Sequence, residues 1–189
     1  MKKLFVATAV IALAVATQAA SVDWSVGANT WTMSNGSKPA KGTTVYLIDG
    51  AQWATIQAAI DGGATSFSTS DAGIIAIGQT SNTKGAVSGT ATSTKLTAGQ
   101  TYDFAYMVFD SSAGQFYASA TKSVAAYDPT DPDYSEVKTV SFAGESFVTT
   151  GLSGGWSSPG SSGGDGPEPT SGLLLLVGAG ILGLRRKRA

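Results

Sequence analysis

The chain of 189 residues contains neither cysteine nor histidine. Without cysteine no disulfide can form, so the stability of a folded domain has to come from its core. The two absences together exclude Ser-His-Asp and Cys-His nucleophilic catalysis, zinc sites with His or Cys ligands, and proton transfer by histidine. The composition therefore favours a protein that is not an enzyme and that needs no cofactor.

Arginine is missing from residues 21–166, the part of the chain between two terminal segments of distinct character. These 146 residues hold six lysines and twelve carboxylates, which give a net charge of −6, although the whole chain has a net charge of −1. Binding to a phosphate backbone requires clustered Lys and Arg, so nucleic acid is not an expected partner. The length suits one domain with a substantial core.

The amino-terminal segment has the three parts of a secretory signal. It begins with two lysines, continues with an apolar stretch over residues 4–16, and reaches small residues around Ala19 and Ala20. This order predicts a signal peptide over residues 1–20, with cleavage after Ala19 or Ala20. The domain that follows is then exported through the secretion translocon.

The carboxyl-terminal segment contains an apolar run, residues 172–184, followed by four cations: Arg185, Arg186, Lys187 and Arg188. Thirteen helical residues span about 20 Å, against a hydrocarbon core of about 30 Å, and the basic side chains extend this reach by placing their charges among the headgroups. Segments rich in Lys and Arg stay in the cytoplasm, so the cations keep this end inside and leave the preceding chain outside. The run predicts a transmembrane helix in the inner membrane.

Directly before the apolar run stand Pro167, Glu168 and Pro169. The order of Pro-Glu-Pro, apolar helix and terminal basic tetrad resembles the PEP-CTERM sorting signal of Gram-negative, exopolysaccharide-producing bacteria, over residues 167–189. The resemblance implies recognition by an integral-membrane exosortase, which processes the protein near the motif for release or surface attachment. A tail anchor that is never cut accounts for the helix and the cations but leaves Pro-Glu-Pro unexplained.

Residues 151–166 are dominated by small polar residues, since 7 Gly, 5 Ser and 1 Pro make up 13 of these 16 positions. Such a composition predicts a flexible linker between the domain and the membrane segment. Trp156 is the exception, and we expect it to dock on the domain, because Trp is rarely left free in a polar linker.

The remaining part, residues 21–150, has the pattern of a mostly β domain. Apolar and polar residues alternate over 22–26, and a more continuously apolar stretch at 43–48 predicts a central strand. Ser34-Asn35-Gly36 has the chemistry of a hairpin turn. Further strands are expected at 73–77, 86–92, 102–110, 116–127, 137–142 and 146–150. The pattern predicts an antiparallel β-sandwich with one short helix covering an end, flanked by the signal helix and the transmembrane helix.

The one helix is expected after the second strand. Asp49 can cap it, while Trp53, Ile56 and Ile60 fall on one face. Gly62-Gly63 then ends it.

An acidic segment is the candidate metal site. Four carboxylates occur within nine residues: Asp128, Asp131, Asp133 and Glu136. Carboxylate oxygens are the ligands that calcium prefers. The spacing departs from that of an EF-hand loop and lacks its glycine. The alternative is a proline-stiffened loop whose acids stay hydrated.

Aromatic residues offer a second candidate site, because an exposed platform of rings can stack on sugars. Trp31 and Tyr117 are expected to be the most exposed, whereas Tyr46, Tyr102 and Tyr106 are expected in the core. The opposing interpretation is that aromatics at alternate strand positions fill the space between sheets.

These features predict an exported, non-enzymatic protein with a structural or adhesive role, anchored transiently in the membrane and then placed at the cell surface or in the extracellular matrix. The alternative is a carbohydrate-binding module of the exopolysaccharide matrix, with polysaccharide as its partner. An enzyme with a carboxylate pair, such as a glycosidase, needs two acids roughly 5 to 10 Å apart in a cleft. The acids of this domain fall mainly in predicted loops.

Overall fold

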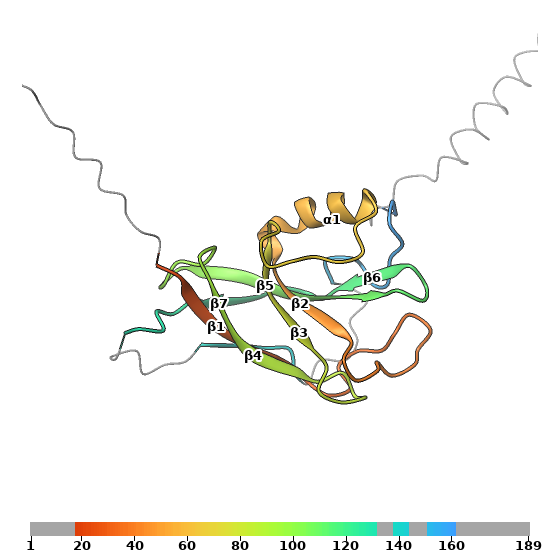
Figure 1. The fold of residues 1–189 in the computed structure, drawn as a ribbon, viewed down its shortest axis with the longest axis horizontal. Helices are drawn as coiled ribbons and strands as arrows, with labels where there is room; N and C mark the ends of the chain where they lie inside the picture. Colours follow the sequence, from red (N-terminus) through yellow and green to blue (C-terminus); the bar gives the residue numbers. More distant parts are fainter. Residues whose placement is uncertain (1–17, 132–137, 144–150, 162–189) are drawn as a thin grey trace, which may run out of the picture.

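A computed structural model of the chain describes residues 18–131, 138–143 and 151–161 (Figure 1). This part is mostly β, with largely antiparallel sheets and one short α-helix, as the sequence predicts. Within it, no helix has the length and apolar character required to cross a bilayer. The two expected terminal helices and the strand expected at 146–150 lie outside the described residues.

The first sheet has three strands in the order β4 (Val87–Ser93), β1 (Ala20–Val26) and β8 (Thr139–Ser141). β1 and β4 are antiparallel throughout their length. β8 runs parallel to β1, which departs from the expected antiparallel arrangement. The alternation expected over residues 22–26 is present, because Val22, Trp24 and Val26 are buried and the residues between them are partly exposed.

The second sheet has the order β3 (Ile74–Gln79), β2 (Thr44–Asp49), β5 (Thr101–Asp110) and β6 (Gln115–Ala118), and β7 (Lys122–Ala125) pairs with the first residues of β5. β2 lies between β3 and β5, and its four middle residues are all buried. The prediction of a central strand is therefore confirmed. The expected β5–β6 hairpin is also present.

The sheets share a hydrophobic cluster to which both contribute side chains. Trp24 and Val140 come from the first sheet, and Leu47 and Tyr106 come from the second. The ring of Phe142, just after β8, packs edge-on against Tyr106 at a centroid distance of 5.1 Å. Large aromatic side chains thus fill the core that both sheets line.

A second cluster lies on the other face of the second sheet, under α1 (Trp53–Asp61). The carboxylate of Asp49 accepts a hydrogen bond from the Ala51 N–H and starts a short 3₁₀ turn, η1 (Gly50–Gln52), that leads into α1. Ile56 and Ile60 are its buried residues. The helix lies over the face of the sheet (Figure 1) and not at an end, because its apolar side packs against β2, β5 and β6.

The strand expected at 116–127 is two strands, β6 and β7. Between their pairings with β5, three residues (119–121) face two residues of β5, so the ladder has one residue too many. Ser119 restores the bonding, because its Oγ accepts from the Tyr106 N–H at 3.0 Å while its own N–H donates to the Tyr106 carbonyl at 2.9 Å.

Residues 151–161, the first part of the Gly/Ser-rich segment, pack along β6 where composition predicts a free coil. The Ala118 N–H donates to Ser153 Oγ at 2.9 Å, and Phe116 exchanges two backbone hydrogen bonds of 2.9 Å with Ser157. Trp156 docks as expected: its indole N–H donates to the Thr32 carbonyl at 3.2 Å. This segment is held by specific hydrogen bonds, and these cannot be predicted from composition.

Candidate functional site

The connection between β1 and β2 is a loop of residues 27–43 that contains no helix or strand. Loops of this length are uncommon in small domains, and they are usually functional or disordered. The turn expected at Ser34-Asn35-Gly36 is present, with the Gly36 N–H donating to the Met33 carbonyl and Gly36 at φ +79°. It does not form a hairpin, because the strands on either side belong to different sheets.

The 27–43 loop is held at both of its ends. Near its start, Trp31 is buried and its indole N–H donates to the Gly85 carbonyl at 3.2 Å. Near its end, the buried Thr80 hydroxyl donates to the Ala40 carbonyl at 2.7 Å and accepts from the Thr43 N–H at 3.0 Å. These contacts fix the loop without a strand or helix.

A carboxylate holds the middle of the loop. Asp110, the last residue of β5, is 1% exposed, and its Oδ2 accepts from the Ser34 hydroxyl at 2.6 Å and the Ser34 N–H at 3.1 Å. Its Oδ1 accepts from the Ser112 hydroxyl at 2.5 Å, the Ser112 N–H at 3.1 Å and the Ala113 N–H at 3.4 Å. Both oxygens are thus engaged, and we call this arrangement the Asp110 clamp.

The hydrogen bonds of the clamp stabilise the charged form of Asp110. The Ser112 and Ser34 hydroxyls, followed by their backbone N–H groups, lower its pKa from 3.8 to about 2, although burial acts in the opposite direction. A carboxylate held ionised with all its acceptors in use is poorly suited to act as a general acid or base. Its arrangement fits a positioning role, joining the loop to the β5–β6 turn.

Beside the clamp the loop borders a cleft of about 530 Å³, within the range of small-ligand sites. Three segments besides the 27–43 loop form its walls: the start of β2, the connection between α1 and β3, and the end of β5 with the following turn. The lining side chains are mostly hydroxyl-bearing or apolar: Met33, Asn35, Ser37, Lys38, Ala40, Thr43, Thr44, Tyr46, Thr65, Ser66, Phe109, Asp110, Ser111 and Ser112.

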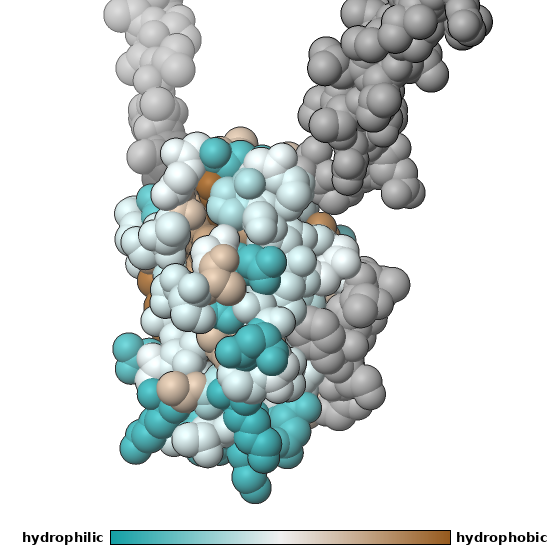
Figure 2. Space-filling view, turned by 90° about the vertical axis from the view of Figure 1, so that its right-hand side faces the viewer, coloured by the Kyte–Doolittle hydropathy of each residue, from teal (hydrophilic) through white to brown (hydrophobic). Residues whose placement is uncertain are grey.

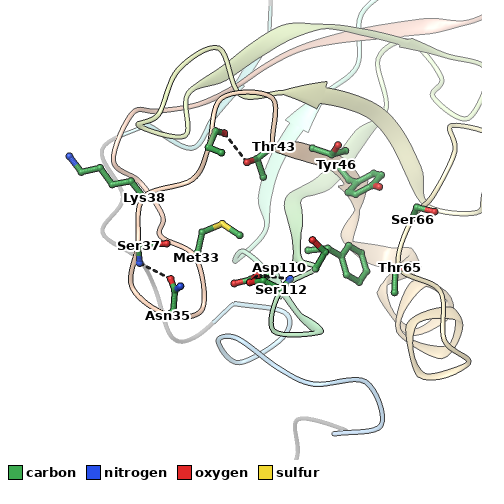
Figure 3. Close-up of a pocket in the computed structure, with 14 residues that line it drawn as sticks. Met33, Asn35, Ser37, Lys38, Thr43, Tyr46, Thr65, Ser66, Asp110 and Ser112 are labelled. Atoms are coloured by element: carbon green, nitrogen blue, oxygen red, sulfur yellow. Dashed lines mark hydrogen bonds between the residues drawn. The ribbon is translucent and has the colours of Figure 1, made fainter.

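Figure 3 shows how these groups are directed. Met33 points toward the middle of the cleft, the ring of Tyr46 lies across from it, and Lys38 extends away. Phe109 is half-buried and is held between Tyr46 at 6.3 Å and Phe67 at 6.0 Å between ring centroids. The cleft thus combines an apolar patch with polar walls.

The face of the molecule in Figure 2 is mostly pale, near the middle of the hydropathy scale, with scattered teal residues and few brown ones. Among the described residues Ile77, on β3, is the one large hydrophobic side chain that is strongly exposed. The described surface therefore offers clefts, and not an apolar patch, as candidate binding features.

The expected aromatic platform is not present in the form that the sequence predicts. Trp31 and Tyr117 are each 1% exposed, so the expectation that they are the most exposed aromatics was wrong. Trp24 is buried in the shared core and Trp53 is half-buried. Tyr117 is covered because Trp156 packs on its ring at 5.9 Å. This arrangement disfavours a flat stacking face.

The tyrosines expected in the core are placed there by the structure. Tyr46 and Tyr106 are buried, and Tyr102 is partly buried against the shared cluster.

Two of the four candidate calcium ligands, Asp128 and Asp131, lie in the described part of the chain. Asp128 is half-buried, and its Oδ1 accepts from the Thr130 hydroxyl at 2.7 Å and the Thr130 N–H at 2.8 Å, which lowers its pKa. Asp133 and Glu136 lie outside the described residues. Among the residues that are described, no three acidic side chains gather at a position suited to a metal. Calcium binding by the whole segment stays a prediction.

The terminal signals fall at the edges of the described chain. Ala20 is the first residue of β1 and is buried, while Ala19 is half-buried. The sorting motif at 167–169 and the basic tetrad at 185–188 lie outside the described residues. Their roles stay predictions from the sequence.

Sequence reasoning missed the cleft and its clamp. The available signals were a 17-residue stretch without hydrophobic periodicity and an aspartate at the end of a strand beside Ser111-Ser112. Neither signal indicates that Asp110 meets Ser34, which lies 76 positions earlier in the chain.

No protein-family model, curated protein or solved structure matches this chain.

Proposed function

We propose that this protein is an exported, non-enzymatic surface or extracellular-matrix protein with a structural or adhesive role, sorted by its carboxyl-terminal segment. The observation that carries the proposal is the order of Pro167-Glu168-Pro169, apolar run and basic tetrad, with a secretory signal at the opposite end. Its partners are the translocon, the inner membrane and an exosortase. We further propose that the two sheets form a β-sandwich and that a signal helix and a transmembrane helix flank this domain.

The architecture of the described domain supports this proposal. The buried side chains of the described residues come from residues 20–153, and among them Ala20 alone belongs to a predicted targeting segment. Removal of residues 1–19 and of the tail from 167 onward therefore takes away no part of that core. A domain of this kind tolerates processing at both ends.

The proposal is tested by comparing surface display of the full chain with that of a chain lacking residues 167–189. The truncated protein should be secreted as a folded domain and lost from the surface. Normal surface display of the truncated chain would contradict the proposal.

A second variant separates a sorting signal from a permanent tail anchor. Replacing residues 167–169 by three alanines leaves the apolar run and the cations intact. A sorted protein should then accumulate uncut in the inner membrane, whereas a tail anchor should behave like the unchanged protein. Pro159→Ala, at an exposed position outside the motif, is the matched control and should be processed normally.

A further inference from the structure

We propose that the cleft beside the Asp110 clamp binds a neutral sugar unit of a glycan. The site differs from the aromatic platform expected from the sequence, because its walls are formed by loops that meet at one end of the second sheet. The proposal does not depend on sorting, since it concerns only what the purified chain binds.

The polar side chains of the cleft suit sugar hydroxyl groups. Within the described residues, the Asn35 amide nitrogen and the hydroxyls of Ser37, Thr65, Ser66 and Ser111 have no partner in the protein. Hydroxyls both donate and accept, as sugar hydroxyls do, so either direction of hydrogen bonding can be matched. These groups come from three separate loops and converge on one space.

The apolar side of the cleft suits the C–H face of a sugar ring. Phe109 and Met33 both line this space, and Met33 points toward its middle (Figure 3). Phe109 is fixed by neighbouring rings, so little conformational entropy is lost when a ligand packs on it. An apolar patch with a few convergent polar groups is the usual composition of a small-ligand site.

The charges around the cleft favour a neutral ligand over an ionic one. Asp110 is the carboxylate among the described lining residues, and both its oxygens are engaged by Ser34 and Ser112. Lys38 is the lining cation, and its side chain extends away from the cleft (Figure 3). Neither charge is directed at a ligand.

The strands at the cleft argue against an extended peptide. Peptides often bind by adding a strand to an open sheet edge. Two strands line the cleft, β2 and the end of β5. From Val45 onward β2 is paired on both sides, with β3 and with β5, and the end of β5 is paired with β6, so little strand edge is open for backbone pairing.

The site is also built before a ligand arrives. The 27–43 loop is held by Trp31, Thr80 and the Asp110 clamp, so its polar groups need little ordering on binding. Preorganisation of this kind raises affinity by reducing the entropic cost.

The test is calorimetric titration of the full chain, in a sugar-free zwitterionic detergent, with cello-, malto-, manno- and xylotetraose and with tetragalacturonate as the anionic probe. We expect saturable binding of at least one neutral tetrasaccharide. Thr65→Trp, which places a large ring at the mouth of the cleft, should weaken it at least tenfold, and Asn35→Ala should weaken it about threefold. Thr94→Trp, at an exposed threonine outside the cleft, is the matched control and should bind as the unchanged chain does.

Three results would overturn the proposal. The first is the failure of every neutral tetrasaccharide to bind. The second is binding of tetragalacturonate alone, which would indicate an anion site. The third is equal affinity of the Thr65→Trp and Thr94→Trp variants, which would place the sugar elsewhere on the chain.

Discussion

The Asp110 clamp gives a quantitative prediction for Asp110→Asn. The amide offers one acceptor oxygen where the carboxylate offers two, so its NH₂ group must face the donors of either Ser34 or Ser112. The lowering of the pKa from 3.8 to about 2 corresponds to at most about 2.4 kcal/mol. The amide oxygen keeps the hydrogen bonds of one of the two serines, so we expect a loss of about 1–2 kcal/mol.

For a domain of this size such a loss lowers the melting temperature by about 3–8 °C. Because the folded pKa of Asp110 lies below its usual value, the stabilisation is fully present above about pH 4 and is lost as the pH falls toward 2. The difference between the two proteins should therefore be largest at neutral pH and shrink below pH 4. Circular dichroism melts at several pH values measure both quantities.

Asp61→Asn is the matched control. Asp61 is exposed and its Oδ1 accepts one hydrogen bond, from the Gly160 N–H, which an amide oxygen can also accept. Its melting temperature should match that of the unchanged protein within about 2 °C. A melt of Asp110→Asn indistinguishable from wild type at pH 7, or a difference that persists undiminished to pH 2, would refute the reasoning.

Three further predictions follow from single contacts. Lys95→Met should free the three backbone carbonyls that the ammonium holds at the end of the α1–β3 connection, and hydrogen exchange should show faster amide exchange there. Gly151→Ala places a Cβ 2.2 Å from a β6 carbonyl, so Trp156 should undock and its fluorescence shift to the red. The exported protein should begin at or before Ala20, because Ser21 is buried with its N–H 2.7 Å from the Tyr127 carbonyl, where a charged amino terminus is costly; amino-terminal sequencing reads this directly.

Each of these has a result that counts against it. An unchanged rate of amide hydrogen exchange in Lys95→Met would mean that the Lys95 ammonium does not stabilise this segment. Ser158→Ala, at an exposed position in the same segment as Gly151, should leave the fluorescence unaltered, and an equal shift in both variants would point to a general loosening. A mature terminus at Ser21 would contradict the account of β1.

The parts of the fold that depend on local pattern could be predicted from the sequence. The alternation at Val22, Trp24 and Val26 indicates a strand with one buried face. The apolar run in β2 indicates a strand with both faces buried. The helix could be placed because its cap at Asp49 and its glycine stop lie within a few residues of it.

The candidate site depends on contacts between distant residues, which local pattern does not contain. Asp110 and Ser34 meet because β5 ends beside a loop from another part of the chain. Trp31 was expected outside because it stands near a turn, yet its ring is buried and bonded to Gly85. Turn chemistry predicts where a chain reverses, but not which way a side chain in the loop faces.

The central claim, that the chain is exported and processed at its carboxyl end, is tested most directly by mass spectrometry of the protein recovered from the cell surface or the medium. The account predicts the mass of a chain that ends near Pro167-Glu168-Pro169 and lacks the apolar run and the basic tetrad. A recovered chain that still ends at Ala189 would contradict it.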